Sequence, residues 1–214
     1  MTTISFAEIG PQERYKLLCA TIVPRPIALV TTVDESGVVN AAPFSFFNVF
    51  AEDPPLVVLG LQHKPDRNRK DTTRNIAERG VFVVNLVDEA LAEAMNVCSV
   101  DFPPEMSEVE AAGLNLRPGL DVPVPHLAEA PFALECRRTA SLAFGPDREI
   151  LIGEVLRLHA RDELLDTRTL RVSTELYKPI GRMFGNAYSR QGDRFDMVKQ
   201  SYAEWERAGA VSGS

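Results

Sequence analysis

The chain has few cysteines, no long hydrophobic run and no excess of positive charge. Its three cysteines, Cys19, Cys98 and Cys136, lie far apart, without the spacing of a metal motif or a disulfide framework, so we expect reduced thiols in a cytoplasmic protein. No apolar segment approaches the roughly 20 residues of a membrane span, and residues 1–10 do not resemble a signal peptide. The net charge of −7 argues against nucleic acid or an anionic membrane as the main partner.

Signs of hydrolytic or metal-dependent chemistry are also missing. His63, His126 and His159 have no metal-like spacing with one another or with the cysteines. The sequence contains neither a Gly-x-Ser-x-Gly elbow nor a Cys–His pairing typical of a nucleophile. We therefore predict no metal site and assign no catalytic residue. A redox cofactor would explain this pattern, because the cofactor itself carries the chemistry.

The 214 residues, 45% of them hydrophobic, suit a single domain spanning 1–214. We expect an N-terminal helical extension over residues 1–22 and a proline-rich surface excursion over 99–131. Residues 198–214 are expected to form a C-terminal tail that contains a short helix from Tyr202 to Ala208.

Short strands at hairpin spacing dominate the remainder. The run 56–61 is continuously apolar, which is typical of a strand buried on both faces, and a helix is expected over 72–79 with Gly80 at its end. A second helix is expected over 89–98, and Ser107 with Glu110 has the spacing of a capping box. Further strands are predicted over 27–32, from Val38 onward, over 81–86, 132–142 and 149–159. Strands with inserted helices favour a β-barrel over a parallel α/β sheet.

Residues 40–75 combine two features of a ligand site. Ser45, Phe46, Phe47 and Asn48 follow a predicted strand, where backbone amides can hold a flat ring. A basic loop then leads into a helix whose N-cap is expected at Asp71 or Thr72, and free amides at a helix start favour anions. The loop's basic residues are Lys64, Arg67, Arg69 and Lys70. A ring site beside a phosphate site suits a mononucleotide such as FMN.

Two alternatives remain open at this point. The basic loop could be solvated charge before a capped helix, and Phe44, Phe46 and Phe47 could be core residues. Side chains alternate between the faces of a strand, so at least one of these rings should leave the main core. That ring would then line a ligand slot or an oligomer interface.

Several segments, in order along the chain, resemble the flavin reductase-like, FMN-binding split-barrel family, in its flavoredoxin-like branch. The resemblance is carried by residues 24–32 (PRPIALVTT), 42–48 (APFSFFN), 53–55 (DPP), 70–72 (KDT) with Asn75, 82–86 (FVVNL), 152–155 (IGEV) and 179–182 (PIGR) with Tyr188. It implies a mainly β fold with added helices, namely a six-stranded antiparallel split β-barrel of the FMN-binding type. It also implies a homodimer with FMN, rather than FAD, at or near the interface.

The resemblance also implies roles for individual residues. Ser45, Phe46, Phe47 and Asn48 would contact the isoalloxazine and ribityl groups, and Lys70, Asp71 and Thr72 would meet the phosphate. The residues expected at the pocket rim are Arg25, Arg182, Tyr188 and Arg190.

The implied activity is that of an FMN-dependent oxidoreductase. It would take hydride from NAD(P)H and pass electrons to free flavin or to a protein partner such as a monooxygenase. The alternatives are a non-enzymatic FMN electron carrier of flavoredoxin type, or a flavin-binding module. Related reductases carry Gly-Asp-His before the Ile-Gly-Glu-Val strand, whereas residues 145–149 here read GPDRE. The sequence therefore leaves the NAD(P)H site unassigned.

Overall fold

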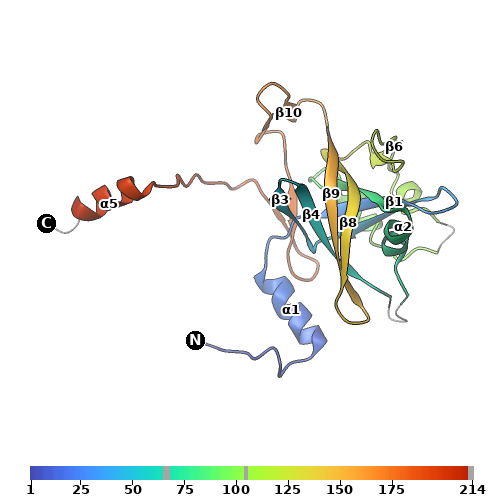
Figure 1. Cartoon of the computed structure of the whole chain (residues 1–214), viewed down its shortest axis with the longest axis horizontal. Coiled ribbons are helices and arrows are strands. Elements are labelled where there is room, and N and C mark those ends of the chain that lie inside the picture. Colours follow the sequence, from blue (N-terminus) through green and yellow to red (C-terminus); the bar gives the residue numbers. More distant parts are fainter. Residues whose placement is uncertain (65–67, 104–105, 212–214) are drawn as a thin grey trace.

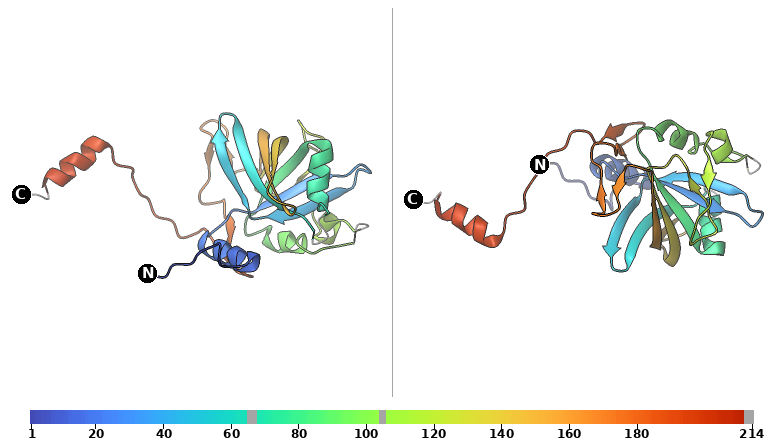
Figure 2. Two further views of the ribbon diagram at one scale, coloured as in Figure 1. Left: turned by 60° about the horizontal axis from the view of Figure 1, so that its bottom comes forward. Right: turned by 90° about the horizontal axis from the view of Figure 1, so that it is seen from above.

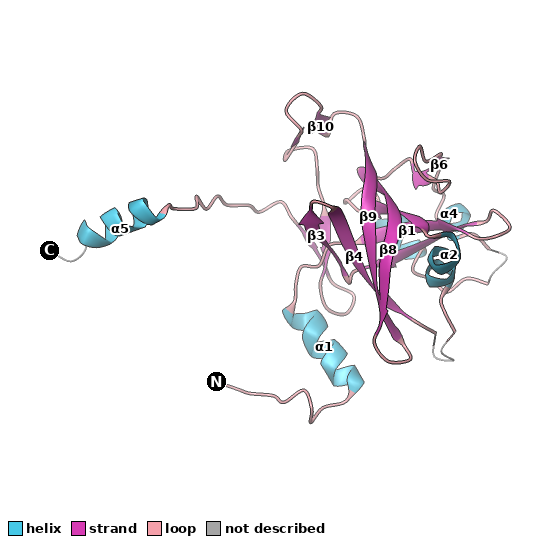
Figure 3. Cartoon of the chain, in the orientation of Figure 1, coloured by secondary structure: helices cyan, strands magenta, loops and turns pink. Residues whose placement is uncertain are grey.

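A seven-stranded antiparallel sheet forms the body of the protein (Figures 1 and 3). The computed structural model describes residues 1–64, 68–103 and 106–211. The strand order is β2-β1-β5-β8-β9-β4-β3. The strands are β1 (Ala28–Val33), β2 (Val39–Phe44), β3 (Phe47–Glu52), β4 (Pro55–Gln62), β5 (Val81–Leu86), β8 (Phe132–Ala143) and β9 (Arg148–Ala160). Every neighbouring pair is antiparallel, as expected for this barrel type.

The connection between β2 and β3 makes the sheet curl into a barrel. These two strands lie at opposite edges of the sheet, yet only Ser45 and Phe46 separate them along the chain. The two edges must therefore meet at these residues, which we call the Ser45 bend. The amide of Gly60 on β4 donates to the Phe46 carbonyl oxygen over 2.7 Å, which extends the β3–β4 pairing into the bend. The sequence predicts six strands, and the sheet has seven. The chain turns at the Ser45 bend, so the residues on its two sides form separate strands, β2 and β3.

Besides the barrel strands, the described part of the chain forms five helices and three two-stranded ribbons (Figure 3). The helices are α1 (Pro11–Thr21), α2 (Asp71–Arg79), α3 (Ala92–Val97), α4 (Glu108–Ala111) and α5 (Tyr202–Val211). The ribbons pair β6 (Leu116–Arg117) with β7 (His126–Leu127), β10 (Leu165–Asp166) with β11 (Arg171–Val172), and β12 (Ile180–Arg182) with β13 (Tyr188–Arg190). Helices α2, α3 and α4 all contact β2, so they stand beside the start of the Ser45 bend.

The barrel interior is filled from alternate positions of its strands. On β4, Val57, Leu59 and Leu61 are buried while the residues between them are partly exposed. The prediction that this run is buried on both faces is therefore wrong. Strand β4 has β9 on one side and the edge strand β3 on the other, and its second face looks outward.

The region 99–131 packs against the barrel where the structure describes it. Val109 and Leu127 belong to one buried cluster, and Val122 and Val124 belong to another. The capping box expected at Ser107 is absent, because the Ser107 hydroxyl donates to the carbonyl oxygen of Val39 over 3.3 Å. That bond ties α4 to β2 in place of capping the helix.

The C-terminal segment lies away from the barrel, and α5 forms its outer part (Figures 1 and 2). Trp205 on α5 is exposed, and its ring lies 6.1 Å from that of Tyr202 on the same helix. Among the helices in the described residues, none has the length and hydrophobicity that crossing a membrane requires.

Candidate functional site

The Ser45 bend presents one aromatic ring to the outside of the barrel. Phe44 and Phe47 pack partly against the main core, whereas Phe46 is exposed and lies 6.3 Å, between ring centroids, from Tyr15 of α1. The prediction that one of the three rings leaves the core is confirmed. Its cause is the bend, which places Phe46 over Gly60, where no side chain occupies the space.

Two large cavities adjoin at the end of β2, where the chain enters the bend. The first, of about 630 Å³, we call the Arg182 cavity, and the second, of about 590 Å³, the Lys70 cavity. Both are lined by Pro43, Phe44 and Ser99, so they are neighbours along β2. A smaller cavity of about 300 Å³ links Ser45 to Lys70 on the other side of Phe44. All three cavities are lined by Pro43 and Phe44, so they lie together around the end of β2.

The Lys70 cavity contains the start of α2. Lys70 itself is the N-cap, so the prediction of Asp71 or Thr72 as the cap is wrong by one or two residues, and no side chain caps the helix. The first backbone hydrogen bond of α2 runs from the Arg74 amide to the Lys70 carbonyl oxygen over 2.9 Å. The amides of residues 71–73 therefore precede the helical hydrogen-bond pattern, as anion-binding amides do.

Side chains around this helix start are already partly engaged. The buried Thr72 hydroxyl accepts a hydrogen bond from Asn40 Nδ2 over 2.9 Å. Asp71 pairs with Arg74 over 2.8 Å, and Lys70 Nζ lies 3.9 Å from an oxygen of Asp101. Arg69 is exposed, and Arg67 lies outside the described residues. Lys70 remains half-exposed and lines the cavity.

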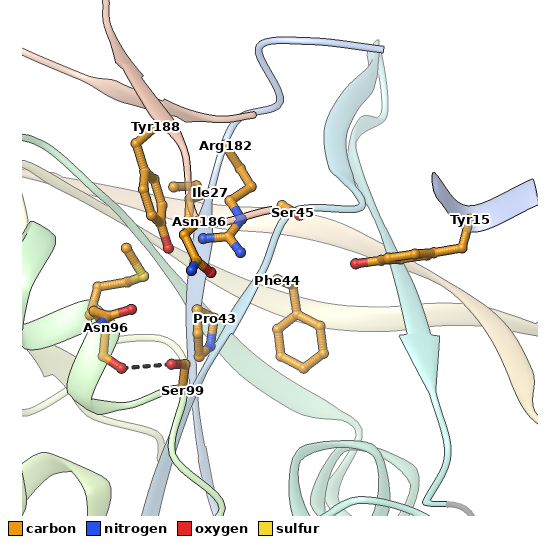
Figure 4. A pocket seen from close by; sticks show the side chains of 11 residues that line it. Tyr15, Ile27, Pro43, Phe44, Ser45, Asn96, Ser99, Arg182, Asn186 and Tyr188 are labelled. Atoms are coloured by element: carbon orange, nitrogen blue, oxygen red, sulfur yellow. Dashed lines mark hydrogen bonds between the residues drawn. The ribbon is translucent and has the colours of Figure 1, made fainter. Parts of the chain in front are cut away.

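The Arg182 cavity is lined mainly by polar and aromatic groups (Figure 4). Arg182 and Asn186 point into it, with Tyr188 on one side and Tyr15 on the other. The Arg182 guanidinium lies 4.5 Å from the Tyr188 ring centre and donates to the Gly185 carbonyl oxygen over 2.6 Å. Of the described residues that line this cavity, only Arg182 carries a formal charge. A bound group there would meet one cation between aromatic walls.

The remaining residues predicted from the sequence lie outside these two cavities. Buried Arg25 donates to the carbonyl oxygens of Cys19 over 2.7 Å, Ile22 over 2.9 Å and Met183 over 3.0 Å, which ties α1 to the end of β12. Asn48 and Phe47 line an apolar groove beside β3, and exposed Arg190 pairs with Glu89 over 3.0 Å. Their part in ligand binding stays a prediction.

Several lining residues were not anticipated from the sequence: Tyr15, Asn96, Ser99, Asn186 and Phe102. They come from three separate segments and carry no motif. Among these residues, Tyr15 has a phenol whose pKa is raised, chiefly by burial.

The turn 145–149 is the place where related reductases carry a histidine, and this chain has none there. His63, directly after β4, contacts this turn instead. Its Nδ1 lies 3.1 Å from the Pro146 carbonyl oxygen.

Comparison with known proteins agrees with this architecture. The family model of the flavin reductase like domain matches residues 20–181. The chain belongs to the flavin reductase-like family. The 2-nitrobenzoate 2-nitroreductase NbaA of Pseudomonas fluorescens is 40% identical, covers 94% of this chain and 98% of its own, and superposes with a TM-score of 0.87.

Two further solved structures are similar to this chain. Nitrilotriacetate monooxygenase component B from Bacillus cereus is 38% identical, with 92% and 98% of the two chains covered and a TM-score of 0.87. Flavoredoxin of Desulfovibrio vulgaris (Miyazaki F) is 19% identical, with 85% and 92% covered and a TM-score of 0.70, and it shares the fold. The flavin reductase-like fold predicted from the sequence is therefore confirmed.

Proposed function

We propose that the protein is an FMN-dependent oxidoreductase that takes hydride from NAD(P)H and passes electrons to free flavin or to a monooxygenase partner. The observation that carries this proposal is the adjoining pair of cavities at the Ser45 bend. One offers helix amides and Lys70, which suit a phosphate, and the other offers polar groups between aromatic rings, which suit a planar ring system. When bound, the flavin supplies the electron-transfer chemistry.

The residues around the Lys70 cavity fit one phosphate better than two. Lys70, the hydroxyl of Thr72 and the free amides of α2 gather at one side of the cavity. The cavity also contains Lys64 and the carboxylates of Asp71, Asp101 and Glu108, and Asp101 lies 3.9 Å from Lys70 Nζ, so little positive charge is left over for a second phosphate. This charge distribution supports FMN over FAD. In this proposal, the ring is held within the Arg182 cavity by Ser45, Arg182 and Tyr188, while Asp71 lies at the phosphate end. The other predicted residues, Phe46, Phe47, Asn48, Arg25 and Arg190, would lie around the ring from outside that cavity.

Substitution of Lys70 separates phosphate recognition from ring recognition. A charge-assisted contact contributes about 1.5–3 kcal/mol, so Lys70→Ala should weaken FMN binding by about tenfold or more and leave riboflavin binding nearly unchanged. Exposed Lys16, replaced by Ala, is the matched control. Thr72→Ala is avoided because it would leave the Asn40 amide without its acceptor. Fluorescence titration measures both flavins, and equal loss of the two would contradict a phosphate site at Lys70.

We also propose a homodimer and a pyridine-nucleotide donor. Strand β3 leaves Val49 and Phe50 on the edge of the sheet, each 69% exposed, which supports burial of this face in an assembly. Anaerobic mixing of the FMN-loaded protein with NADH or NADPH tests the donor. Rapid loss of the visible flavin absorbance supports an oxidoreductase, whereas slow or absent loss would favour a non-enzymatic electron carrier.

A second candidate function is direct reduction of a small aromatic acid. The single cation of the Arg182 cavity, set among Phe44, Tyr15 and Tyr188, favours an anionic planar molecule. NbaA, at 40% identity, is a 2-nitrobenzoate 2-nitroreductase. If the chain shares this activity, Arg182→Gln should raise the KM for 2-nitrobenzoate by about tenfold and leave that for uncharged nitrobenzene unchanged. No turnover of either compound would exclude this candidate.

A further inference from the structure

Residues 191–211, which we call the C-terminal arm, carry apolar side chains that the rest of the chain does not cover. The arm follows β13 and lies outside the body in every view (Figures 1 and 2). Phe195 and Met197 are each 83% exposed, and Val198 is 90% exposed. Tyr202 and Trp205 add exposed rings on α5. Such a concentration of exposed apolar side chains marks a surface that becomes buried in an assembly.

The direction of the arm is set at its start. Arg194 donates to the carbonyl oxygens of Gln191 over 2.8 Å, Thr174 over 3.1 Å and Tyr177 over 3.3 Å. These bonds anchor the arm to the segment before β12. Beyond Arg194, the described residues 195–207 form hydrogen bonds only with other residues of the arm. The arm is therefore fixed at one end and without support from its own barrel along the rest.

The outer part of the arm is capped as a helix without help from the body. Ser201 and Glu204 form a reciprocal capping box, with the Ser201 amide donating to Glu204 Oε2 over 2.7 Å and the Glu204 amide donating to Ser201 Oγ over 3.3 Å. A helix of 10 residues is nonetheless marginal in water when it packs on nothing. This helix therefore requires a surface to pack on.

The body offers an apolar surface on the side from which the arm leaves. It consists of β3 and two grooves that flank it, of about 390 and 410 Å³, both lined by Pro26, Phe47 and Asn48. Val49 and Phe50 lie exposed on β3. We call this surface the β3 face. Figure 1 places β3 on the margin of the barrel nearest the arm.

We propose that the arm of one copy packs across the β3 face of a second copy, and that the exchange is mutual. Seven extended residues and the 10-residue helix span about 38 Å, more than the roughly 30 Å diameter of a small domain. An arm of this reach can cross a neighbouring copy. A two-fold axis beside β3 would bring each arm to the other's β3 face, and this arrangement closes as a dimer. The inference rests on the homodimer within the proposed function and specifies how its copies are joined.

The chain provides its own reporter for this arrangement, because Trp205 is its single tryptophan. Tryptophan fluorescence of the flavin-free, full-length protein therefore reports on the arm alone. We expect the dimer to show blue-shifted emission that acrylamide quenches poorly. Dilution to monomer should shift the emission to the red and make quenching severalfold more effective, in parallel with the loss of mass seen by light scattering.

Variants on both partners of the contact complete the test. Phe195→Asp combined with Met197→Asp on the arm, and Phe50→Asp on the β3 face, should each raise the dimer Kd about tenfold or more and expose Trp205. Leu120→Asp, which changes an equally exposed leucine outside both surfaces, should do neither. The arm residues are so exposed that their substitution cannot unfold the barrel.

Three results would overturn the arm exchange. These are a monomer at micromolar concentration, a dimer in which Trp205 stays fully accessible, and a dimer unaffected by the arm variant. A monomer with a shielded Trp205 would instead show that the arm folds onto its own barrel, which also contradicts the exchange. FMN titration of the same samples tests the flavin function separately, so a failure of one proposal is distinguishable from a failure of the other.

Discussion

Glu135 on β8 is a fully buried carboxylate whose neighbours keep it charged. It accepts backbone hydrogen bonds from Leu120 over 2.8 Å, Asp121 over 2.7 Å and Val122 over 2.8 Å, and His159 Nε2 lies 2.6 Å away. Burial by itself raises the pKa of this carboxyl, but these four hydrogen bonds outweigh burial and lower the pKa to about 2. One side chain thereby fastens the loop before β7 to the barrel.

Replacing this carboxylate should make the protein less stable at neutral pH. Because the pKa of Glu135 falls from its ordinary 4.5 to about 2 on folding, its stabilisation is complete at neutral pH and is lost as pH drops through this interval. Glu135→Gln, which places an amide group against backbone donors, should lower the free energy of unfolding by about 3 kcal/mol at neutral pH. Urea unfolding measured at neutral pH and at about pH 3 checks this, since the difference from wild type should shrink in acid.

Exposed Glu175, replaced by Gln, controls for the loss of one negative charge. A Glu135→Gln protein whose deficit is the same at both pH values would show that the charge of this carboxyl is not what stabilises the loop.

Individual contacts of this kind are not readable from the sequence. Glu135 and His159 are 24 positions apart and meet as diagonal neighbours on the paired strands β8 and β9, where Ala133 lies opposite His159 and Glu135 lies opposite Arg157. Tyr15 and Arg182 line one cavity although 167 positions separate them, and no periodicity encodes such a meeting. Residues 45–48 and 70–72 could be predicted as site residues because each group is contiguous and its chemistry is local.

The central strands and α2 were predictable because local signals define them. The run 56–61 becomes β4 (Pro55–Gln62), and α2 ends where predicted, at Gly80 with φ of 73°. The helix expected from Glu89 begins at Ala92 instead, because Asp88 Oδ1 accepts the Leu91 amide over 3.1 Å and forms a turn first. Strands of two or three residues, such as β6 and β12, are too short to show alternation.

Strand β4 can approach the Ser45 bend only because residue 60 is glycine. A Cβ built on Gly60 would lie 2.9 Å from the Phe46 Cβ, closer than side-chain carbons pack. The Gly60 amide donates to the Phe46 carbonyl oxygen over 2.7 Å at the same place. The approach of β4 to the bend and the position of the exposed Phe46 ring therefore depend on one missing side chain.

Gly60→Ala should therefore disturb both stability and ligand binding. Overpacking of this kind costs about 1–3 kcal/mol, and the displacement of Phe46 would move the bend, whose Ser45 lines the Arg182 cavity. We expect a lower free energy of unfolding together with weaker FMN and riboflavin binding, since the ring end of the site is affected. Urea unfolding and fluorescence titration measure the two effects. Gly192→Ala, where a Cβ meets no atom within 4 Å, is the matched control. Unchanged flavin affinity in a destabilised Gly60→Ala protein would place the ring away from the bend.

At the scale of the whole molecule, the candidate site lies where the fold closes. The edges of the sheet meet at the Ser45 bend, and α2, α3 and α4 contact the strand that leads into it. Separating these elements by unfolding would destroy both cavities. A ligand held between them binds the folded chain and not the unfolded one, so its binding energy adds to global stability.

Bound FMN should therefore raise the stability of the entire chain. A ligand present at a hundredfold excess over its Kd adds about 2.7 kcal/mol to the free energy of unfolding. For a chain of this length, that corresponds to a rise in Tm of about 5–11 °C. Thermal unfolding with and without FMN measures the shift.

Riboflavin and a Lys70 variant provide the controls. Riboflavin at the same concentration should give a smaller rise in Tm, because it lacks the phosphate that Lys70 and the α2 amides meet. Lys70→Ala should reduce the rise in Tm caused by FMN towards the riboflavin value. A Tm that does not move at any FMN concentration would mean that the folded chain has no flavin site, even though its cavities have residues suited to a flavin.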